Sequence, residues 1–229
     1  MSMLAGFRQV RASLLERAVV DPGLVEAIID YRIGPATGMS DVEAVLAQLP
    51  KDMRDGIQQM PAELRAQFVA EYTKALSELP EEIRNGVVRH ARGPATRPAI
   101  EPADVGEELD LEKAWHGVHF LLCGTNDTAP APLGDAVLGG TPIGEDIGYG
   151  PARYLDPQRV KAVHTALRRI DGGAFIGRFD AAKLKQAEIY PSGWTSDDRR
   201  AWLADAYERL RTFYAQSASG GWAVLLYLQ

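Results

Sequence analysis

The chain has 229 residues, of which 46% are hydrophobic and 24% are charged, and its formal net charge is −6. This composition is typical of a globular protein and makes a disordered or fibrous chain a poor interpretation. The acidic balance argues against general binding of nucleic acids or anionic membranes, because both require a basic surface. The single cysteine, Cys123, excludes an internal disulfide and a zinc site built from several cysteines.

Neither end of the sequence indicates export or membrane insertion. The first ten residues lack the charged segment and the long apolar run of a signal peptide. The apolar run at residues 222–228 is far shorter than the ~20 residues that cross a bilayer. We therefore expect a cytoplasmic protein that binds neither nucleic acid nor membrane.

The first part of the chain is predicted to form a short strand followed by a long helical stretch. Residues 3–10 are biased toward apolar side chains, which favours an opening strand. From about residue 13 to about residue 90, apolar residues recur at helical spacing. Gly34-Pro35 breaks the second of these helices, and Ser40-Asp41 is a candidate cap for a third.

A proline-led pattern occurs three times in this helical stretch. Pro50, Pro61 and Pro80 are each followed by an acidic residue and then by an arginine. Proline is favoured at the first helical position, and acids in the first turn face the positive end of the helix dipole. Because the spacing is unequal, the pattern indicates three helix starts rather than a solenoid. A peptide-binding groove between the helices is the alternative.

The second half of the chain follows a candidate linker at residues 92–106, which is rich in Pro, Gly, Ala and Thr. Asp110 is a candidate cap for a helix ending near Cys123, and residues 125–150 are expected to be mostly loop. Beyond the loop we expect extended segments at 153–155, 188–190 and 222–228 and helices at 156–170, 180–187 and 196–217. The run at 222–228 is continuously apolar, which is typical of a central strand buried on both faces.

Two histidines lie on the helix predicted to end near Cys123. His116, His119 and Cys123 are spaced so that they share one helix face. Ligands from one straight helix rarely enclose a metal ion, so no metal site is expected. The histidines are expected to be buried and satisfied by backbone or carboxylate groups. The alternative is an exposed functional histidine, because this side chain titrates near neutral pH.

A glycine-rich segment at residues 139–154 contains the first two candidates for ligand binding. Its spacing differs from a Rossmann fingerprint, and it lacks the Gly-Lys-Ser/Thr of a P-loop. Tyr149 and Arg153 are the candidates, since the planar guanidinium of Arg153 suits a carboxylate or a phosphate. The alternative is a structural loop in which Arg153 pairs with a nearby acid.

A third group of candidates comprises Glu188, Tyr190 and Trp194. A strand at 188–190 would direct Glu188 and Tyr190 to the same face. A carboxylate beside aromatic rings is either a buried acid with a raised pKa or part of a ligand clamp. The alternative is a structural Glu188 that accepts a hydrogen bond from a histidine or from Arg153. No nucleophile elbow, metalloprotease helix or deaminase signature accompanies these residues.

Several blocks of the sequence resemble a known family. They are residues 1–10, 109–120, 136–140, 148–155, 179–180, 188–191 and 223–228. In their order and number these blocks resemble the YfbM-like family of bacterial proteins, a domain of unknown function. The resemblance implies an α+β fold and supplies no established catalytic residues. The long helical stretch departs from compact members and indicates an insertion, and Cys123 stands where members carry a threonine.

These observations predict an α+β fold in which the N- and C-terminal strands share one small mixed sheet packed with helices. We expect a single domain with a core of residues 1–12 and 107–229 and a helical insertion at about 13–100. The leading hypothesis is a non-enzymatic binding or interaction module for a protein or small-molecule ligand, without a cofactor. It would be a monomer or a homodimer, with the insertion as one candidate dimerisation surface.

The candidate binding residues are Tyr149, Arg153, Tyr190 and Trp194. The alternative function is a small hydrolase or transferase, whose catalytic candidates are His116, His119 and Glu188. In that alternative a histidine acts as base, Glu188 acts as acid or orienting group, and Arg153 holds an anion.

Overall fold

A computed structural model of the chain describes residues 3–31, 100–194 and 197–229, together with six separate positions between residues 60 and 71. The chain divides into two compact units, residues 1–30 with 100–229 and residues 31–99. The elements described below belong to the first unit. Most of the helical stretch expected between residues 31 and 90 lies outside the described residues. So do most of the proline-led pattern and the larger part of the linker.

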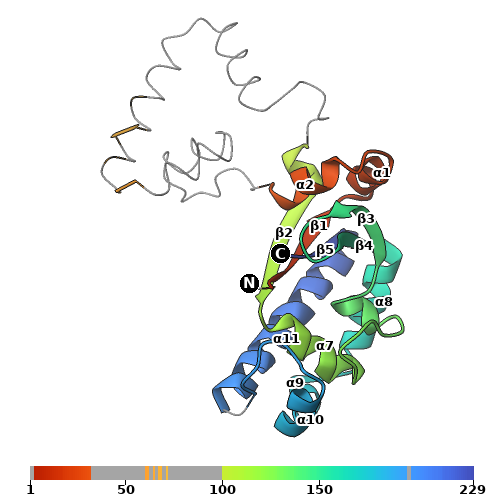
Figure 1. Ribbon diagram of the computed structural model, residues 1–229. Coiled ribbons are helices and arrows are strands. Elements are labelled where there is room, and N and C mark those ends of the chain that lie inside the picture. Colours follow the sequence, from red (N-terminus) through yellow and green to blue (C-terminus); the bar gives the residue numbers. More distant parts are fainter. Residues whose placement is uncertain are drawn as a thin grey trace, which may run out of the picture. The chain divides into compact units, whose positions relative to one another are not determined.

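The first unit is built on one sheet of five strands in the order β2-β1-β5-β4-β3 (Figure 1). The strands are β1 (Ala5–Val10), β2 (Val105–Glu112), β3 (Thr141–Asp146), β4 (Pro151–Leu155) and β5 (Ala223–Leu228). The two terminal strands pair along their whole length, and β5 is the central strand. The predicted α+β class and the shared sheet are confirmed. All four described pairings are antiparallel, whereas a mixed sheet was expected.

Helices pack against both the faces and the ends of this sheet. They are α1 (Ala12–Val20), α2 (Leu24–Ile29), α7 (Trp115–Cys123), α8 (Pro157–Leu167), α9 (Gly172–Ile176), α10 (Ala181–Gln186) and α11 (Asp197–Ser219), with short 3-10 turns η1 (Pro102–Asp104) and η2 (Gly134–Ala136). In Figure 1 the long helix α11 runs behind the sheet with α8 beside it. None of the described helices combines the length and apolar character that a bilayer crossing requires.

The main core lies between α11 and the sheet. Phe7 of β1 and Phe213 of α11 meet edge to face, with ring centroids 6.2 Å apart, a favoured geometry for aromatic pairs. Leu226 of β5 and Leu155 of β4 belong to the same buried cluster. Every side chain of β5 except Leu228 is buried, as the continuous apolar run predicted.

Local sequence signals explain where several helices begin. Asp156 accepts a hydrogen bond from the Arg159 amide at 2.8 Å, and Pro157 occupies the first helical position of α8. Asp180 accepts from the Ala182 and Lys183 amides and so caps α10. Both caps were predicted from the sequence, and α11 ends before Gly220-Gly221 as expected.

Three expectations were wrong. Asp110 does not cap a helix: residues 110–112 are the end of β2, because the apolar residues of this segment alternate with acids at the strand period, and α7 begins at Trp115. Strand β3 lies inside the segment expected to be loop, where its proline and glycine hide the strand pattern. Glu188 lies in a turn after α10 with φ +52°, so residues 188–190 are not a strand.

A bulge between β1 and β2 is stabilised by one buried side chain. Arg8 faces Glu108 and Val10 faces Val105, so Gln9 is opposite two residues instead of one. The Gln9 Oε1 atom accepts from the Glu107 amide at 3.0 Å, and its Nε2 donates to Ser217 Oγ at 3.0 Å. The Gln9 side chain therefore joins the bulge to α11.

Replacing Gln9 by leucine is expected to lower the free energy of unfolding by about 1–3 kcal/mol, because the buried Ser217 hydroxyl loses its donor and the Glu107 amide loses its acceptor. Urea denaturation measures this change. The matched control is Gln216→Leu, at an exposed position of α11, which should change stability by less than about 0.5 kcal/mol. Equal effects of the two substitutions would contradict the role given to Gln9.

Candidate functional site

The hairpin formed by β3 and β4 presents Tyr149 at its tip. Asp146 Oδ1 accepts hydrogen bonds from the amides of Gly148 at 2.8 Å and Gly150 at 3.0 Å. These bonds fold the backbone around Tyr149, whose side chain is 38% exposed. The glycine-rich segment is therefore a hairpin whose tip is held by one carboxylate.

Tyr149 and Arg153 line the same small cavity, whose volume is about 50 Å³. Most of the remaining wall is apolar and comes from the ends of β1 and β5 and from the segment after η2: Ala5, Phe7, Val137, Leu138, Leu226 and Leu228. The structure thus brings together two residues that the sequence singled out. The other five candidates do not line this cavity.

Arg153 is held in place by backbone rather than by an acid. Its Nη1 donates to the Gly140 carbonyl at 3.2 Å. Within the described residues the guanidinium forms no ion pair, so the expected alternative of a structural pair with a nearby acid is not observed there. A guanidinium has five N–H donors, and its remaining donors are available at the edge of the cavity.

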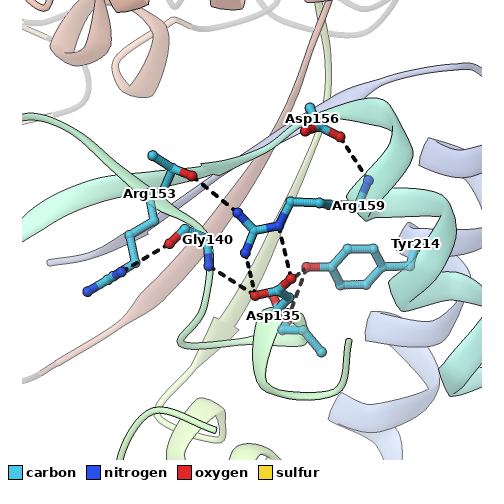
Figure 2. A network of polar contacts seen from close by, with 8 residues as sticks. Asp135, Gly140, Arg153, Asp156, Arg159 and Tyr214 are labelled. Carbon is cyan, nitrogen blue, oxygen red and sulfur yellow. Dashed lines mark hydrogen bonds and ion pairs between the residues drawn. The ribbon is translucent and has the colours of Figure 1, made fainter. Parts of the chain in front are cut away.

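The position of Gly140 is in turn fixed by a partly buried ion pair, which Figure 2 shows. Arg159 of α8 makes two parallel bonds to Asp135, from Nε to Oδ2 at 3.0 Å and from Nη2 to Oδ1 at 2.7 Å. The Gly140 amide also donates to Asp135 Oδ1, at 3.2 Å. Asp135 is 5% exposed. Such bidentate pairs are strong and directional.

Gly140 can take this position because it lacks a side chain. Its φ is +100°, and a Cβ atom there would approach the Tyr154 carbonyl to 2.9 Å. Its amide bonds to Asp135 and its carbonyl to Arg153. The backbone of this one residue, Gly140, therefore connects the ion pair to Arg153 at the cavity.

Helix α11 supports the same network from the core side. The Tyr214 hydroxyl donates to the Ala136 carbonyl at 3.1 Å and, more weakly, to the Asp135 carbonyl at 3.4 Å. Burial raises the pKa of Tyr214, so this hydroxyl stays protonated and remains a donor at neutral pH. The 3-10 turn η2 is thus fastened to both α8 and α11.

Asp135, Arg159 and Tyr214 were not among the candidates from the sequence. Arg159 stands at the start of a helix, where an exposed arginine is the ordinary expectation, and Asp135 lies in a segment without a regular pattern. No sequence signal linked residues separated by 24 positions. Their pairing depends on tertiary structure.

His116 is committed to hydrogen bonds with the backbone. Its Nδ1 accepts from the Tyr190 amide at 3.1 Å, so the proton of the neutral ring must be on Nε2, which lies 3.1 Å from the Asn126 carbonyl. Burial lowers the pKa of this imidazole. The ring also stacks on Trp115, with centroids 4.7 Å apart. His116 thus joins α7 to two turns.

His119 is fully buried and has one bonded nitrogen. Its Nε2 lies 2.7 Å from the Asp127 carbonyl and therefore donates to it. Its buried Nδ1 has no hydrogen-bond partner in the described part of the chain. Burial lowers the pKa of His119, because a second ring proton would have no acceptor.

The remaining candidates lie around α7 without forming a cavity with Arg153. Glu188 is exposed. The Tyr190 hydroxyl accepts from the Met3 amide at 3.3 Å, and buried Trp194 donates from Nε1 to the Ile189 carbonyl at 2.7 Å. Burial raises the pKa of Cys123 to about 11, which makes its thiol a poor nucleophile at neutral pH.

A larger hollow of about 300 Å³ lies between β2 and α11, but most of its charged groups already have partners. Glu108 pairs with Arg8 at 2.6 Å, and Glu208 pairs with Arg211 at 3.0 Å. A ligand would have to compete with these pairs. Across the described residues no group of three or more histidine, cysteine or acidic side chains is arranged to hold a metal ion.

Comparison with known proteins identifies relatives of the chain. A family model described as a domain of unknown function (DUF1877) matches residues 1–227. Protein YfbM of Escherichia coli (strain K12) is 32% identical over 93 residues, which cover 39% of this chain and 55% of YfbM. The chain thus spans about half the length of this curated relative. A crystal structure of YfbM, a protein of unknown function, is similar with a TM-score of 0.53 and 17% identity, covering 99% of both chains. At this identity the similarity shows the fold alone.

Asp135→Asn is expected to lower the free energy of unfolding by about 1.5–3 kcal/mol, because a charge-assisted pair is lost while Arg159 stays partly buried. Chemical denaturation measures the loss. Asp205→Asn, which breaks the exposed pair with Arg209, is the control and should cost at most about 1 kcal/mol. A loss for Asp135→Asn no larger than the control would show that the ion pair does not fix the network.

Acid is expected to destabilise the fold in a way that depends on the two histidines. Their pKa values are lowered in the folded chain, so stability is greatest above the ordinary value of 6.5 and falls as the pH drops below it. Urea midpoints between about pH 7.5 and 5.5 measure the slope. His119→Gln should reduce that slope. An unchanged slope would show that His119 does not contribute to the pH dependence of stability.

Proposed function

We propose a binding role for this chain, which belongs to the family defined by the domain of unknown function DUF1877. In this proposal the ligand occupies the cavity that Tyr149 and Arg153 line. The family resemblance predicted from the sequence blocks is confirmed by the match over residues 1–227. The observation that carries the proposal is the joint presence, at one cavity, of an aromatic ring, an apolar wall and an arginine that pairs with no acid among the described residues. Apolar walls with a few convergent polar groups are typical of ligand sites.

The geometry supports an anionic ligand. The Arg153 guanidinium is oriented by its bond to the Gly140 carbonyl, so less conformational entropy is lost when it binds a carboxylate or a phosphate. Tyr149 adds a phenolic hydroxyl and a rigid ring at the exposed side of the cavity. The apolar wall supports a ligand that carries an aliphatic or aromatic group beside its charge.

The hydrogen bonds favour binding over catalysis. A general base needs a nitrogen that can reach the substrate, whereas both ring nitrogens of His116 bond to backbone groups. His119 is fully buried. Its Nδ1 atom, which has no hydrogen-bond partner among the described residues, is buried as well and cannot reach a substrate in solvent. The hydrolase or transferase alternative is therefore not favoured by any observation at these residues.

The proposal also covers the setting and organisation of the chain. Similarity to an E. coli protein supports a bacterial setting, and we propose that the chain acts in the cytoplasm. We propose one binding domain with a helical insertion, which the sequence placed at about residues 13–100. The second compact unit begins at residue 31, because α1 and α2 belong to the first unit.

The proposal predicts that partners retained from a cell extract are lost when the cavity is altered. Tyr149→Ala combined with Arg153→Gln should abolish retention, because it removes the two side chains that are proposed to hold the ligand and keeps the hairpin backbone. Arg169→Gln, at an exposed position after α8, is the matched control and should retain the same partners as the unmodified chain. Quantitative mass spectrometry of the retained material is the measurement.

Unfolding midpoints within about 3 °C of the unmodified chain establish that the variants are folded. If the double variant retains every partner at the same level as the control, the cavity is not the binding site.

A further inference from the structure

The cavity beside Tyr149 and Arg153 is too small for a whole metabolite. Its volume is about 50 Å³, whereas sites for small molecules and cofactors usually measure about 300–1,000 Å³. One water needs roughly 10–15 Å³ of such volume, so the cavity accepts about four non-hydrogen atoms. This is the size of a valine or leucine side chain. The rest of the ligand must lie outside the cavity.

The lining requires a charged group and an aliphatic group that are close neighbours on the ligand. Arg153 and Tyr149 share the cavity with Phe7, Leu226 and Leu228. A ligand that satisfies all of them must carry its anion within a few ångströms of its apolar group. An internal aspartate or glutamate has no aliphatic group of its own beyond its short stem, so it meets this requirement only with help from a neighbouring residue.

The last residue of a protein chain meets both requirements by itself. Its α-carboxylate and its Cβ are attached to the same Cα atom, so charge and side chain are two bonds apart. We infer that the cavity binds the C-terminal residue of another protein chain, with an aliphatic side chain inside and the terminal carboxylate on Arg153. This inference rests on the proposed function, because it names the occupant of the same site.

The network around Gly140 suits this role. A terminal carboxylate binds best to a guanidinium whose direction is already fixed, because fewer rotamers are lost on binding. Arg153 Nη1 is tied to the Gly140 carbonyl, and Gly140 is tied through its amide to Asp135. Within the described residues the other donors of Arg153 have no acceptor, so they can bind a terminal carboxylate.

The test uses the full chain and short fluorescein-labelled peptides of the sequence Gly-Ser-Gly-Leu, with either a free or an amidated C-terminus. Fluorescence anisotropy should give at least about tenfold tighter binding for the free acid, since a charge-assisted hydrogen bond contributes about 1.5–3 kcal/mol. Arg153→Gln should remove this preference, and the control Arg169→Gln should keep it. Unlabelled 4-methylpentanoate, the small acid with the same aliphatic group, should displace the peptide only at far higher concentration.

Three results would overturn the inference. Equal affinity for acid and amide would show that the terminal carboxylate is not recognised. Displacement by 4-methylpentanoate as effective as by unlabelled peptide would identify a small carboxylic acid as the ligand. Failure of both peptides to bind would exclude an aliphatic chain end. In each case, loss of extract partners in the Tyr149→Ala and Arg153→Gln double variant would still uphold the proposed function, and retention of them would reject it as well.

Discussion

The bidentate ion pair between Asp135 and Arg159 determines the geometry on which the candidate site depends. It fastens the short 3-10 turn η2 to the first turn of α8. Because Asp135 is almost fully buried, its charge needs this partner, and the cost of leaving it unpaired is far larger than for a surface acid. The same carboxylate orders the Gly140 amide, and the Gly140 carbonyl orients Arg153. The buried carboxylate of Asp135 thus positions Arg153 through Gly140, in addition to pairing with Arg159.

The polar side chains of the second half of the chain consequently separate into two groups with different roles. Around α7, the imidazoles bond to backbone groups of the turns that follow α7 and α10, and they act as fasteners between elements. Arg178 extends this pattern by donating to the Leu121 and Leu122 carbonyls at the end of α7, where helix carbonyls lack partners. Around the β3–β4 hairpin, the guanidinium of Arg153 keeps unused donors. The hairpin, and not the histidine pair, is therefore where the proposed site lies.

The sequence predicted those parts of the fold that have local causes. The central strand β5 follows from seven consecutive apolar residues, and α8 and α10 follow from their aspartate caps. Where local patterns conflict with tertiary structure, prediction was wrong: β3 contains Pro142 and Gly144, which are unfavourable in strands.

The sequence also identified Tyr149 and Arg153, because glycine spacing indicated an unusual backbone around them. It did not identify Asp135, since the ion pair of that acid is formed with Arg159, which is distant in sequence. Similarity to YfbM supports the α+β architecture, and the site has to be argued from the contacts of this chain.

Two-dimensional NMR of the isotope-labelled chain during titration with the free-acid peptide tests the central claim most directly. The account predicts that the largest shift changes occur at the Tyr149 amide, at Arg153 including its Nε–H group, and at Gly140, with little change at His116 and Trp194. Changes concentrated around His116 and Trp194, with Arg153 unaffected, would contradict it.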